Sequence, residues 1–379
     1  MKKHSAPAVT VLLITTLLVL AAARATAGIA EDLGASIDAR VAPLVASRGG
    51  LFGGKPEVVG VVVGVIRDGE QAIFSYGKVD HDSEREPDGE TLFEIGSLTK
   101  TFTGALLADA IARGDVSLED PIRRHLPEKA LPRNADRGEI ILRHLATHSS
   151  GLPRLPSNLD PKSLDDPYAD FAPEDLWHYL AKRGLARKND RWEYSNLGAG
   201  LLGQLLVEVA GAQDYESLVL ERICRPLGMT DCRATWRDED VGRRATPYRK
   251  YGKRHPYWRM DALSGAGALH ASMNDMLRWA SAHLAAAAGT GNPVLAASHE
   301  ELIPVNGEFS SGMFWIRLAR GGFDQALLFH DGRTGGFSSA IFLAPGRRSA
   351  VVILANTASQ KLNPLGEELL RLVAGVPES

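Results

Sequence analysis

Strand-like segments at both ends of the chain, with helix-like segments between them, constrain the fold more than any other feature. Residues 58–66 are rich in valine, Asp68-Gly69 is a strong hairpin signal, and residues 71–76 form the expected return strand. Three further strand patterns lie near the end of the chain, at residues 326–329, 339–343 and 350–354. This arrangement predicts one sheet that is built from both ends of the chain.

Helical patterns fill the middle of the chain and flank the strands. They cover residues 28–47, 101–112, 140–146, 173–182, 197–210, 272–284 and 362–373. Pro173 suits the first turn of its helix, and Ser272-Met273-Asn274-Asp275 resembles a capping box. Residues 151–170 are rich in proline and aspartate and lack periodicity, so we expect a long loop there.

We therefore expect an α/β (α+β) fold, in which an antiparallel sheet is flanked by helices and carries an inserted, mostly helical subdomain. The sheet-bearing part is expected over about residues 28–100 and 300–379, and the helical insertion over about residues 101–299. A cleft between the two parts is the natural place for a functional site.

The first 27 residues are expected to be a secretory signal peptide rather than part of the fold. Lys2 and Lys3 give a positive start, residues 9–23 are apolar, and Ala25-Thr26-Ala27 has the small-x-small pattern of a cleavage site. The apolar run is short for a membrane span of about 20 residues, although an uncleaved anchor is the alternative. The remaining residues, 28–379, are predicted to form an exported protein, periplasmic or secreted, without a stable membrane span.

The composition fits a folded, soluble protein with a hydrophobic core and argues against nucleic acid as a partner. Hydrophobic residues make up 44% of the chain and charged residues 23%, while the formal net charge is only -3. The two cysteines, Cys224 and Cys232, are compatible with a disulfide in an exported protein, but geometry decides such a bridge and the sequence leaves it open. The oligomeric state is open as well.

The first chemical motif is Ser97-Leu98-Thr99-Lys100, directly before a helical pattern. Residues three apart lie on one face of a helix, so Lys100 would lie beside the hydroxyl of Ser97 if both are in the first turn. A serine needs a base to become a nucleophile, and a buried lysine with a lowered pKa can be that base. Taken alone, the motif is weak, because it occurs by chance in most proteins of this size, and a capping serine with a solvated lysine is then the favoured interpretation.

Two weaker motifs follow. Tyr194-Ser195-Asn196 precedes the helix expected at residues 197–210; tyrosine can relay a proton, and asparagine can hold an amide or an ammonium group. The segment His330-Asp331-Gly332-Arg333-Thr334-Gly335-Gly336-Phe337 lies between two expected strands, where glycines let a backbone N–H approach a developing oxyanion. By themselves these segments are also compatible with a surface loop and a glycine-rich hairpin.

The order and spacing of the three motifs resemble the serine β-lactamase and penicillin-binding protein clan, in particular the class C β-lactamase-like branch. That branch includes D-alanyl-D-alanine carboxypeptidases, β-lactamases and carboxylesterases, with the pattern Ser-x-x-Lys, Tyr-x-Asn and then Lys-Thr-Gly or His-x-Gly. Further similar segments lie at residues 142–153, 226–229 and 264–267, so that the resemblance extends over about residues 58–356. It implies the β-lactamase/transpeptidase-like fold.

The resemblance also implies the roles of the site residues. Ser97 would be the acylated nucleophile, and Lys100 its base partner. Tyr194 would share the base role and protonate the leaving group, while Asn196 would orient Lys100 and an amide of the substrate. The backbone N–H groups of Ser97 and Arg333 would form the oxyanion hole.

The third motif departs from Lys-Thr-Gly, because His330 replaces the lysine and Asp331 replaces the threonine. In the resemblance that lysine recognises a carboxylate, whereas a histidine is charged only part of the time near neutral pH. We expect Asp331 either to repel a carboxylate or to point away on the other face of the strand, and Arg333 to be a possible source of positive charge. The expected substrate-binding residues are Asn196, His330, Gly332, Arg333 and Thr334.

The sequence therefore predicts an exported serine hydrolase that forms an acyl-enzyme on amide or ester bonds, with D-alanyl peptides first and β-lactams second. A carboxylesterase is the alternative, and a penicillin-binding sensor or scaffold without turnover is an alternative of a different class. No cofactor or metal is expected: His144 and His148 are four residues apart, but the residues between them supply no glutamate.

Overall fold

An eight-stranded antiparallel sheet forms the centre of the protein in a computed structural model, which describes residues 28–46, 56–132, 139–185, 191–250 and 252–377. Across the sheet the strands are β2 (Glu70–Gly77), β1 (Gly60–Arg67), β12 (Ser349–Ala355), β11 (Ser338–Ala344), β10 (Leu327–Arg333), β9 (Ile316–Leu318), β8 (Phe309–Ser311) and β7 (Ile303–Pro304). The expected signal peptide lies outside the described residues.

The pairing of β1 with β12 joins the two ends of the chain, as the sequence predicts. The two strands run antiparallel, with Val61 opposite Ala355 and Val65 opposite Val351. Strand β1 also pairs with β2 through the predicted Asp68-Gly69 turn, in which both residues have positive φ values of 53° and 88°. The valine-rich strand is thus a central strand, buried between neighbours on both sides.

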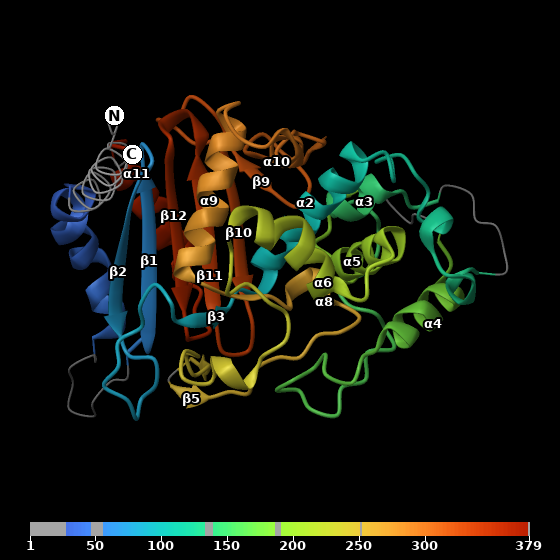
Figure 1. Cartoon of the computed structure of the whole chain (residues 1–379), viewed down its shortest axis with the longest axis horizontal. Coiled ribbons are helices and arrows are strands. Elements are labelled where there is room, and N and C mark those ends of the chain that lie inside the picture. Colours follow the sequence, from blue (N-terminus) through green and yellow to red (C-terminus); the bar gives the residue numbers. More distant parts are fainter. Residues whose placement is uncertain (1–27, 47–55, 133–138, 186–190, 251, 378–379) are drawn as a thin grey trace, which may run out of the picture.

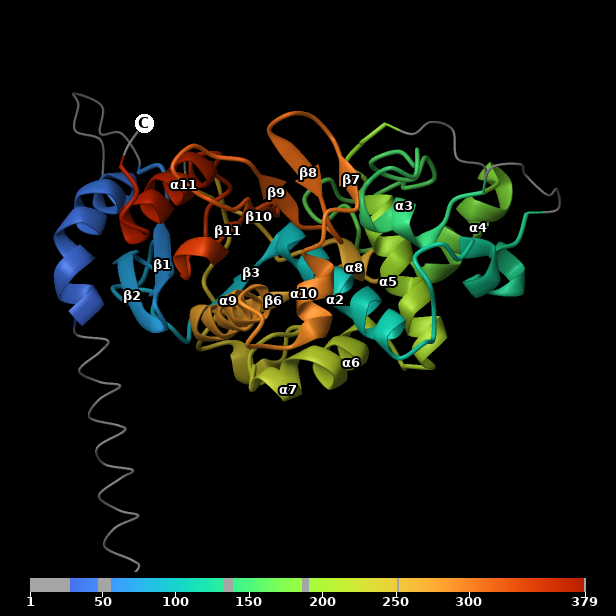
Figure 2. The same cartoon turned by 90° about the horizontal axis from the view of Figure 1, so that it is seen from above.

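Helices cover both faces of the sheet (Figures 1 and 2). The helix over residues 28–45 and α11 (Leu362–Val373) lie on one face, where Ile37, Val63 and Val373 belong to one buried cluster. On the other face lies α9 (Met273–Ala287), so close to β1 that a Cβ atom at Gly64 would be 2.5 Å from the sulfur of Met273. The sheet is therefore the middle of three layers.

Most of the other helices lie between β2 and α9 in the sequence, and α3, α4 and α5 among them lie on the right of Figure 1. The helices of this segment are α2 (Thr99–Ala112), α3 (Leu142–Ala146), α4 (Pro173–Arg183), α5 (Asn196–Ala210), α6 (Tyr215–Val219), α7 (Arg225–Leu227) and α8 (Ser264–Gly267), and α10 (Pro293–Ser298) follows α9. Helices α5 and α8 touch through glycines, since a Cβ atom at Gly203 would lie 3.0 Å from the Cα atom of Gly265. Residues 151–170 contain no helix or strand, as expected.

Two pairs of short strands were not predicted. One joins β3 (Leu92–Glu94) to β6 (His270–Ser272), and the other joins β4 (Tyr248–Arg249) to β5 (Lys253–Arg254). The β3–β6 pair matters for the site, because β3 leads directly into the Ser97 motif and β6 leads into α9.

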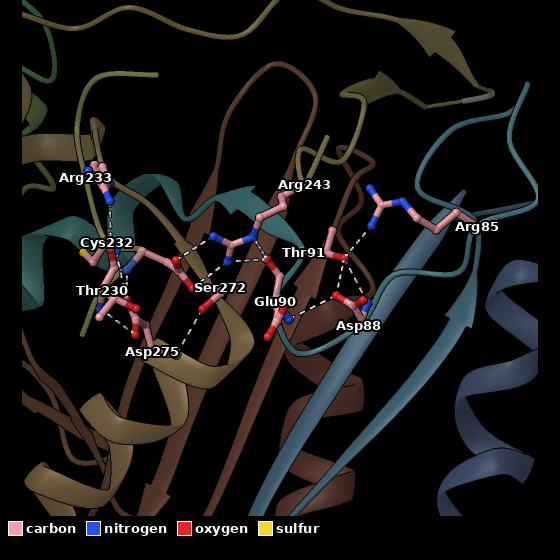
Figure 3. A network of polar contacts seen from close by, with 11 residues as sticks. Arg85, Asp88, Glu90, Thr91, Thr230, Cys232, Arg233, Arg243, Ser272 and Asp275 are labelled. Carbon is pink, nitrogen blue, oxygen red and sulfur yellow. Dashed lines mark hydrogen bonds and ion pairs between the residues drawn. The ribbon is translucent and has the colours of Figure 1, made fainter. Parts of the chain in front are cut away.

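The start of α9 differs from the predicted capping box. Ser272 accepts a hydrogen bond from the N–H of Asp275, as expected of an N-cap. The carboxylate of Asp275, however, accepts hydrogen bonds from the N–H groups of Thr230, Asp231 and Cys232 instead of reaching back to Ser272 (Figure 3). Asp275 thus anchors a loop against α9.

Two further expectations concern the cysteines and the membrane. Cys224 and Cys232 are free thiols in this structure; both are buried and lie within hydrogen-bond contact of each other. Among the described residues, no helix has both the length and the apolar character needed to span a membrane.

Candidate active site

Ser97 lies on a 3₁₀ turn (Gly96–Leu98) between β3 and α2. The turn is pressed against β10: Gly96 has a φ of +50°, and a Cβ atom there would lie 2.8 Å from the backbone nitrogen of Arg333. Only glycine fits that position without strain. Ser97 therefore precedes α2 instead of lying in its first turn as predicted, but Lys100 still faces its hydroxyl.

The amine of Lys100 is completely buried and contacts three oxygen atoms. Its Nζ lies 3.0 Å from Oγ of Ser97, 2.9 Å from Oδ1 of Asn196 and 2.6 Å from the carbonyl oxygen of Ala266. Burial lowers the pKa of Lys100 well below its usual value, and the positive charge of Arg154 lowers it further. These two causes favour the neutral amine.

Tyr194 lies beside this amine, with its ring centroid 4.8 Å from Nζ of Lys100. Its phenol is in side-chain hydrogen-bond contact with Ser97. Burial raises the pKa of Tyr194 above its ordinary value, so the phenol keeps its proton at neutral pH. The structure thus brings Ser97, Lys100 and Tyr194 together.

The N-terminus of α5 positions Tyr194 and Asn196. Ser195 is the N-cap: its hydroxyl accepts a hydrogen bond from the N–H of Gly198 and donates one to the carbonyl of Pro153. Asn196 is the first residue of the helix, and its buried side chain faces Lys100. A single cap therefore holds both residues that flank it.

His148 packs against the ring of Tyr194. The two ring centroids are 4.4 Å apart, and Nδ1 of His148 accepts a hydrogen bond from the N–H of Ser195. Burial lowers the pKa of His148, and the charge of Lys100 acts in the same direction. A neutral imidazole that packs on Tyr194 and holds the N-cap backbone fits a positioning residue better than a metal ligand.

His330 is buried on β10 and carries no charge near neutral pH. Burial lowers its pKa to about 4, and the charge of Lys100 acts in the same direction. Its Nδ1 lies 2.7 Å from the carbonyl oxygen of Asp331, and its ring centroid is 6.4 Å from that of Tyr194. His330 therefore does not supply the positive charge of the lysine that it replaces.

Asp331 points to the opposite face of β10, which was one of the two expectations for it. Its carboxylate accepts a hydrogen bond from the side chain of Asn363 on α11. The guanidinium of Arg333 lies 3.9 Å from the same carboxylate and is 48% exposed. The side chain of Arg333 is thus paired away from the reactive cluster and does not provide the charge that the sequence suggested.

The backbone of Arg333 is placed differently from its side chain. The N–H of Thr334 donates to the carbonyl of Phe337 at 3.1 Å, which makes these two residues a hydrogen-bonded pair of the β10–β11 hairpin. Because such pairs alternate along an antiparallel ladder, the N–H of Arg333 points away from β11. Within the described residues, β9 pairs with β10 only as far as Phe329, so this N–H points to an open edge.

Gly332 lets this edge approach the nucleophile. A Cβ atom at Gly332 would lie 2.0 Å from the carbonyl oxygen of Ile95 and 3.0 Å from the backbone nitrogen of Ser97. Any larger residue would push β10 away from the serine turn. The arrangement brings the backbone of Ser97 next to that of Arg333, as an oxyanion hole requires.

Thr334 is used inside the hairpin. Its hydroxyl accepts hydrogen bonds from the N–H groups of Gly336 and Phe337 at 3.4 and 3.2 Å, and it interacts with the buried carboxyl of Glu94. The predicted binding role of its side chain therefore has less support in the geometry than those of Asn196 and Gly332.

Sequence reasoning missed three contributors to the site: the carbonyl of Ala266, the ring of His148 as support, and the guanidinium of Arg154. Ala266 and His148 lie in segments that resemble the family, which was the available signal. A backbone carbonyl, however, leaves no trace in the residue type.

Two large cavities lie outside this cluster. One of about 580 Å³ is lined by residues that include Trp192 and Pro304, and one of about 540 Å³ by residues that include Trp177 and Asp261. Neither contains a predicted site residue, so we place the site on the geometry of the side chains.

Comparisons with known proteins agree with the fold and with the family that the sequence resembles. The sequence profile of the Beta-lactamase family matches residues 37–375. The D-alanyl-D-alanine-carboxypeptidase/endopeptidase AmpH of Escherichia coli K12 is 31% identical over 223 residues, which is 58% of this chain and 56% of that relative. A β-lactamase of Pseudomonas fluorescens is 28% identical over 360 residues, 86% of this chain and 94% of that protein.

A solved structure extends the similarity to the fold. The β-lactamase/D-alanine carboxypeptidase from Pseudomonas syringae superposes with a TM-score of 0.72 at 20% sequence identity, covering 85% of this chain and 95% of that one. At this identity the similarity concerns the fold alone, a mixed α/β architecture around a large antiparallel sheet.

Proposed function

Because the chain belongs to the β-lactamase family, we propose that it is a serine hydrolase in which Ser97 attacks a carbonyl group and forms an acyl-enzyme. The observation that carries this proposal is the position of the Lys100 amine, 3.0 Å from Oγ of Ser97 and buried among oxygen atoms. A buried, unpaired lysine is costly, and it is the group that a serine needs as a base.

The three contacts of Lys100 support one direction of proton transfer. A neutral amine has two N–H bonds and one lone pair. The oxygen atoms of Asn196 and Ala266 are acceptors only, so they take the two N–H bonds. The lone pair is then left for the hydroxyl proton of Ser97. Lys100, whose pKa is lowered, is therefore the base in acylation.

Tyr194 supplies the leaving-group proton in this scheme. The raised pKa of its phenol keeps it protonated, so it starts the cycle as an acid. When the oxygen of Ser97 bonds to the carbonyl carbon and the bond to the leaving group breaks, Tyr194 protonates the leaving atom and Lys100 returns a proton to Tyr194. Water then adds to the acyl-enzyme, and Ser97 regains its proton.

The backbone N–H groups of Ser97 and Arg333 stabilise the negative charge on the carbonyl oxygen. Backbone donors of this kind contribute about 10²–10³-fold each in related chemistry. The closeness of Gly96 and Gly332 to the opposing backbone supports this assignment, because it leaves no side chain between the two donors.

We take D-alanyl peptides as the first substrate class and β-lactams as the second, since AmpH is a D-alanyl-D-alanine-carboxypeptidase/endopeptidase and the Pseudomonas fluorescens relative is a β-lactamase. Small acyl esters remain the third class. The neutral His330 weakens the case for strong β-lactamase activity. Cell-wall peptides as substrates also fit the proposed export of the protein through residues 1–27.

The test uses three substrates and one label. Turnover of diacetyl-L-lysyl-D-alanyl-D-alanine, nitrocefin and a p-nitrophenyl ester is measured for the wild type and for Ser97→Ala. We expect Ser97→Ala to lose at least about 10³-fold in kcat while keeping its fold by circular dichroism.

A fluorescent penicillin separates a hydrolase from a slow binder. Transient label on Ser97 with release of product supports the proposal, whereas permanent label without product would identify a penicillin-binding sensor. Undiminished hydrolysis in Ser97→Ala would end the proposal.

A further inference from the structure

Arg154 is a cation beside the reactive cluster that has no carboxylate partner among the described residues. Its side chain is exposed, and its guanidinium carbon lies 5.1 Å from the ring centroid of Tyr194. Arg259, another exposed arginine, lies 2.8 Å from a carboxylate oxygen of Asp166. Within the described part of the chain, no carboxylate therefore compensates the charge of Arg154.

The backbone at Arg154 is held by hydrogen bonds, although its guanidinium has no carboxylate partner among the described residues. Its carbonyl oxygen accepts hydrogen bonds from the N–H groups of Asn196 and Leu197, both at 3.1 Å. The preceding residue, Pro153, accepts one from the hydroxyl of Ser195 at 2.7 Å. The segment is thus fixed to the N-terminus of α5, next to Tyr194, so the guanidinium starts from a defined place.

The positive charge of Arg154 acts electrostatically on the groups of the reactive cluster. This charge contributes to the lowered pKa values of Lys100 and His148, and it offsets part of the rise that burial causes in the pKa of Tyr194. Lys100 and His330 are both driven towards their neutral forms, whereas Arg154, among the described residues, is a permanent positive charge that acts on this cluster. Asp331, the carboxylate whose field also reaches Lys100, is engaged with Asn363 on the other face of β10.

We propose that Arg154 binds a carboxylate of the substrate and so makes this enzyme selective for anionic acyl compounds. The inference rests on the proposed serine hydrolase function and assigns to Arg154 the recognition that a lysine on β10 would otherwise provide. A guanidinium presents two parallel N–H donors that match a carboxylate, and it stays charged at every working pH. The carboxylate belongs either to the leaving group or to the acyl group.

The experiment compares matched substrate pairs that differ in one charge. Diacetyl-L-lysyl-D-alanyl-D-alanine and its C-terminal amide differ on the leaving-group side. The p-nitrophenyl monoester of succinic acid and p-nitrophenyl butyrate differ on the acyl side, a carboxylate in place of a methyl group. Values of kcat/KM are measured for the wild type, Arg154→Gln and Arg154→Lys.

We expect Arg154→Gln to lower kcat/KM about 10- to 100-fold for the carboxylate member of one pair, mainly through KM, and less than about threefold for its neutral partner. The pair that responds identifies the side of the scissile bond. Arg154→Lys keeps the positive charge but lacks the two parallel N–H donors of the guanidinium. This variant should therefore recover part of the loss in kcat/KM. Arg113→Gln, which removes a charge at the far end of α2, serves as the control and should leave both pairs unchanged.

Equal losses for both members of each pair would overturn the inference. They would mean that Arg154 acts only through the pKa of Lys100, which would appear as one common upward shift of the acid limb of the pH–rate profile. A failure of the proposed function is distinguishable, because the wild type would then turn over no member of either pair in a Ser97-dependent manner.

Discussion

Oδ1 of Asn196 lies 2.9 Å from Nζ of Lys100. Together with the carbonyl oxygen of Ala266, it is one of two oxygen atoms that can only accept a hydrogen bond from this buried amine. An amide oxygen fixes the amine without favouring its charged form as strongly as a carboxylate would. The identity of residue 196 thus controls the protonation state on which the proposed mechanism depends.

The isosteric change Asn196→Asp tests this control. The new carboxylate raises the pKa of Lys100, so the acid limb of the kcat/KM–pH profile should move to higher pH. Activity at pH 7 should fall about tenfold for each pH unit of that shift and recover in alkaline solution. Asn292→Asp, at the exposed N-cap of α10, is the control and should leave the profile in place. An unchanged acid limb in Asn196→Asp would argue against Lys100 as the base.

Glu94 makes stability depend on pH near neutrality. It is buried on β3, and burial raises its pKa to about 8. Between its unfolded value of 4.5 and about 8, the folded state holds a proton that the unfolded state has released. The contribution of Glu94 to the free energy of unfolding is therefore fully present below pH 4.5. It decreases by up to about 1.4 kcal/mol per pH unit as the pH rises to about 8, and it stays constant above that pH.

Glu94→Gln removes this titration and keeps an acceptor for the N–H of Trp258. The variant should be more stable than the wild type at pH 8 and should show a flatter dependence of its unfolding free energy between pH 5 and pH 8. Urea unfolding at several pH values measures both quantities. Glu86→Gln, at an exposed position, should retain the slope of the wild type.

The fold was largely predictable because its strongest signals are local. The valine run of β1 and the Asp68-Gly69 turn define a hairpin, and β11 and β12 are equally apolar. The short strands β7, β8 and β9 were missed, since two or three residues cannot display an alternating pattern. Strand β10 was predicted too short, because its last residues are polar or glycine.

The site was predictable where chemistry needs a particular side chain at a fixed spacing. Ser97 and Lys100 are three residues apart, so local geometry alone brings them together. Tyr194 and Asn196 entered through the resemblance, because nothing local links them to Ser97. The contacts of Arg154 and Ala266 depend on tertiary packing, and an arginine or a backbone carbonyl carries no distinguishing pattern in the sequence.

Buried neutral histidines should make the protein sensitive to acid. His270 shows the effect clearly: it stacks on Trp236 at 3.8 Å, neither ring nitrogen has a hydrogen-bond partner among the described residues, and burial lowers its pKa to about 3. Below pH 6.5 the imidazole of His270 binds a proton in the unfolded state but stays neutral in the folded state until the pH approaches about 3. The contribution of neutral His270 to the free energy of unfolding is thus fully present above pH 6.5 and is lost as the pH falls towards about 3.

His270→Phe keeps an aromatic ring on Trp236 and removes the titrating group. We expect its unfolding free energy to fall less than that of the wild type between pH 6.5 and pH 4.5, as followed by urea titrations. His178→Gln, at an exposed position, is the matched control. An identical acid slope in wild type and His270→Phe would show that His270 takes up its proton in the folded state too.

Asp275 should be among the most sensitive positions for stability, because one buried carboxylate satisfies three backbone N–H groups of residues 230–232 (Figure 3). Asp275→Ala leaves these donors without their partner at the start of α9, which packs on the sheet. Each lost hydrogen bond of this kind costs about 1–3 kcal/mol, so we expect a loss of at least about 3 kcal/mol in urea unfolding.

Asp324→Ala is the control for this prediction. It removes an exposed carboxylate that lies 3.7 Å from Arg347, and it should change the free energy of unfolding by less than about 1 kcal/mol. Because the Ser97 cluster receives no side chain from residues 230–232, Asp275→Ala should keep its kcat at temperatures where it remains folded. A similar small loss in both variants would mean that water replaces the carboxylate at this corner.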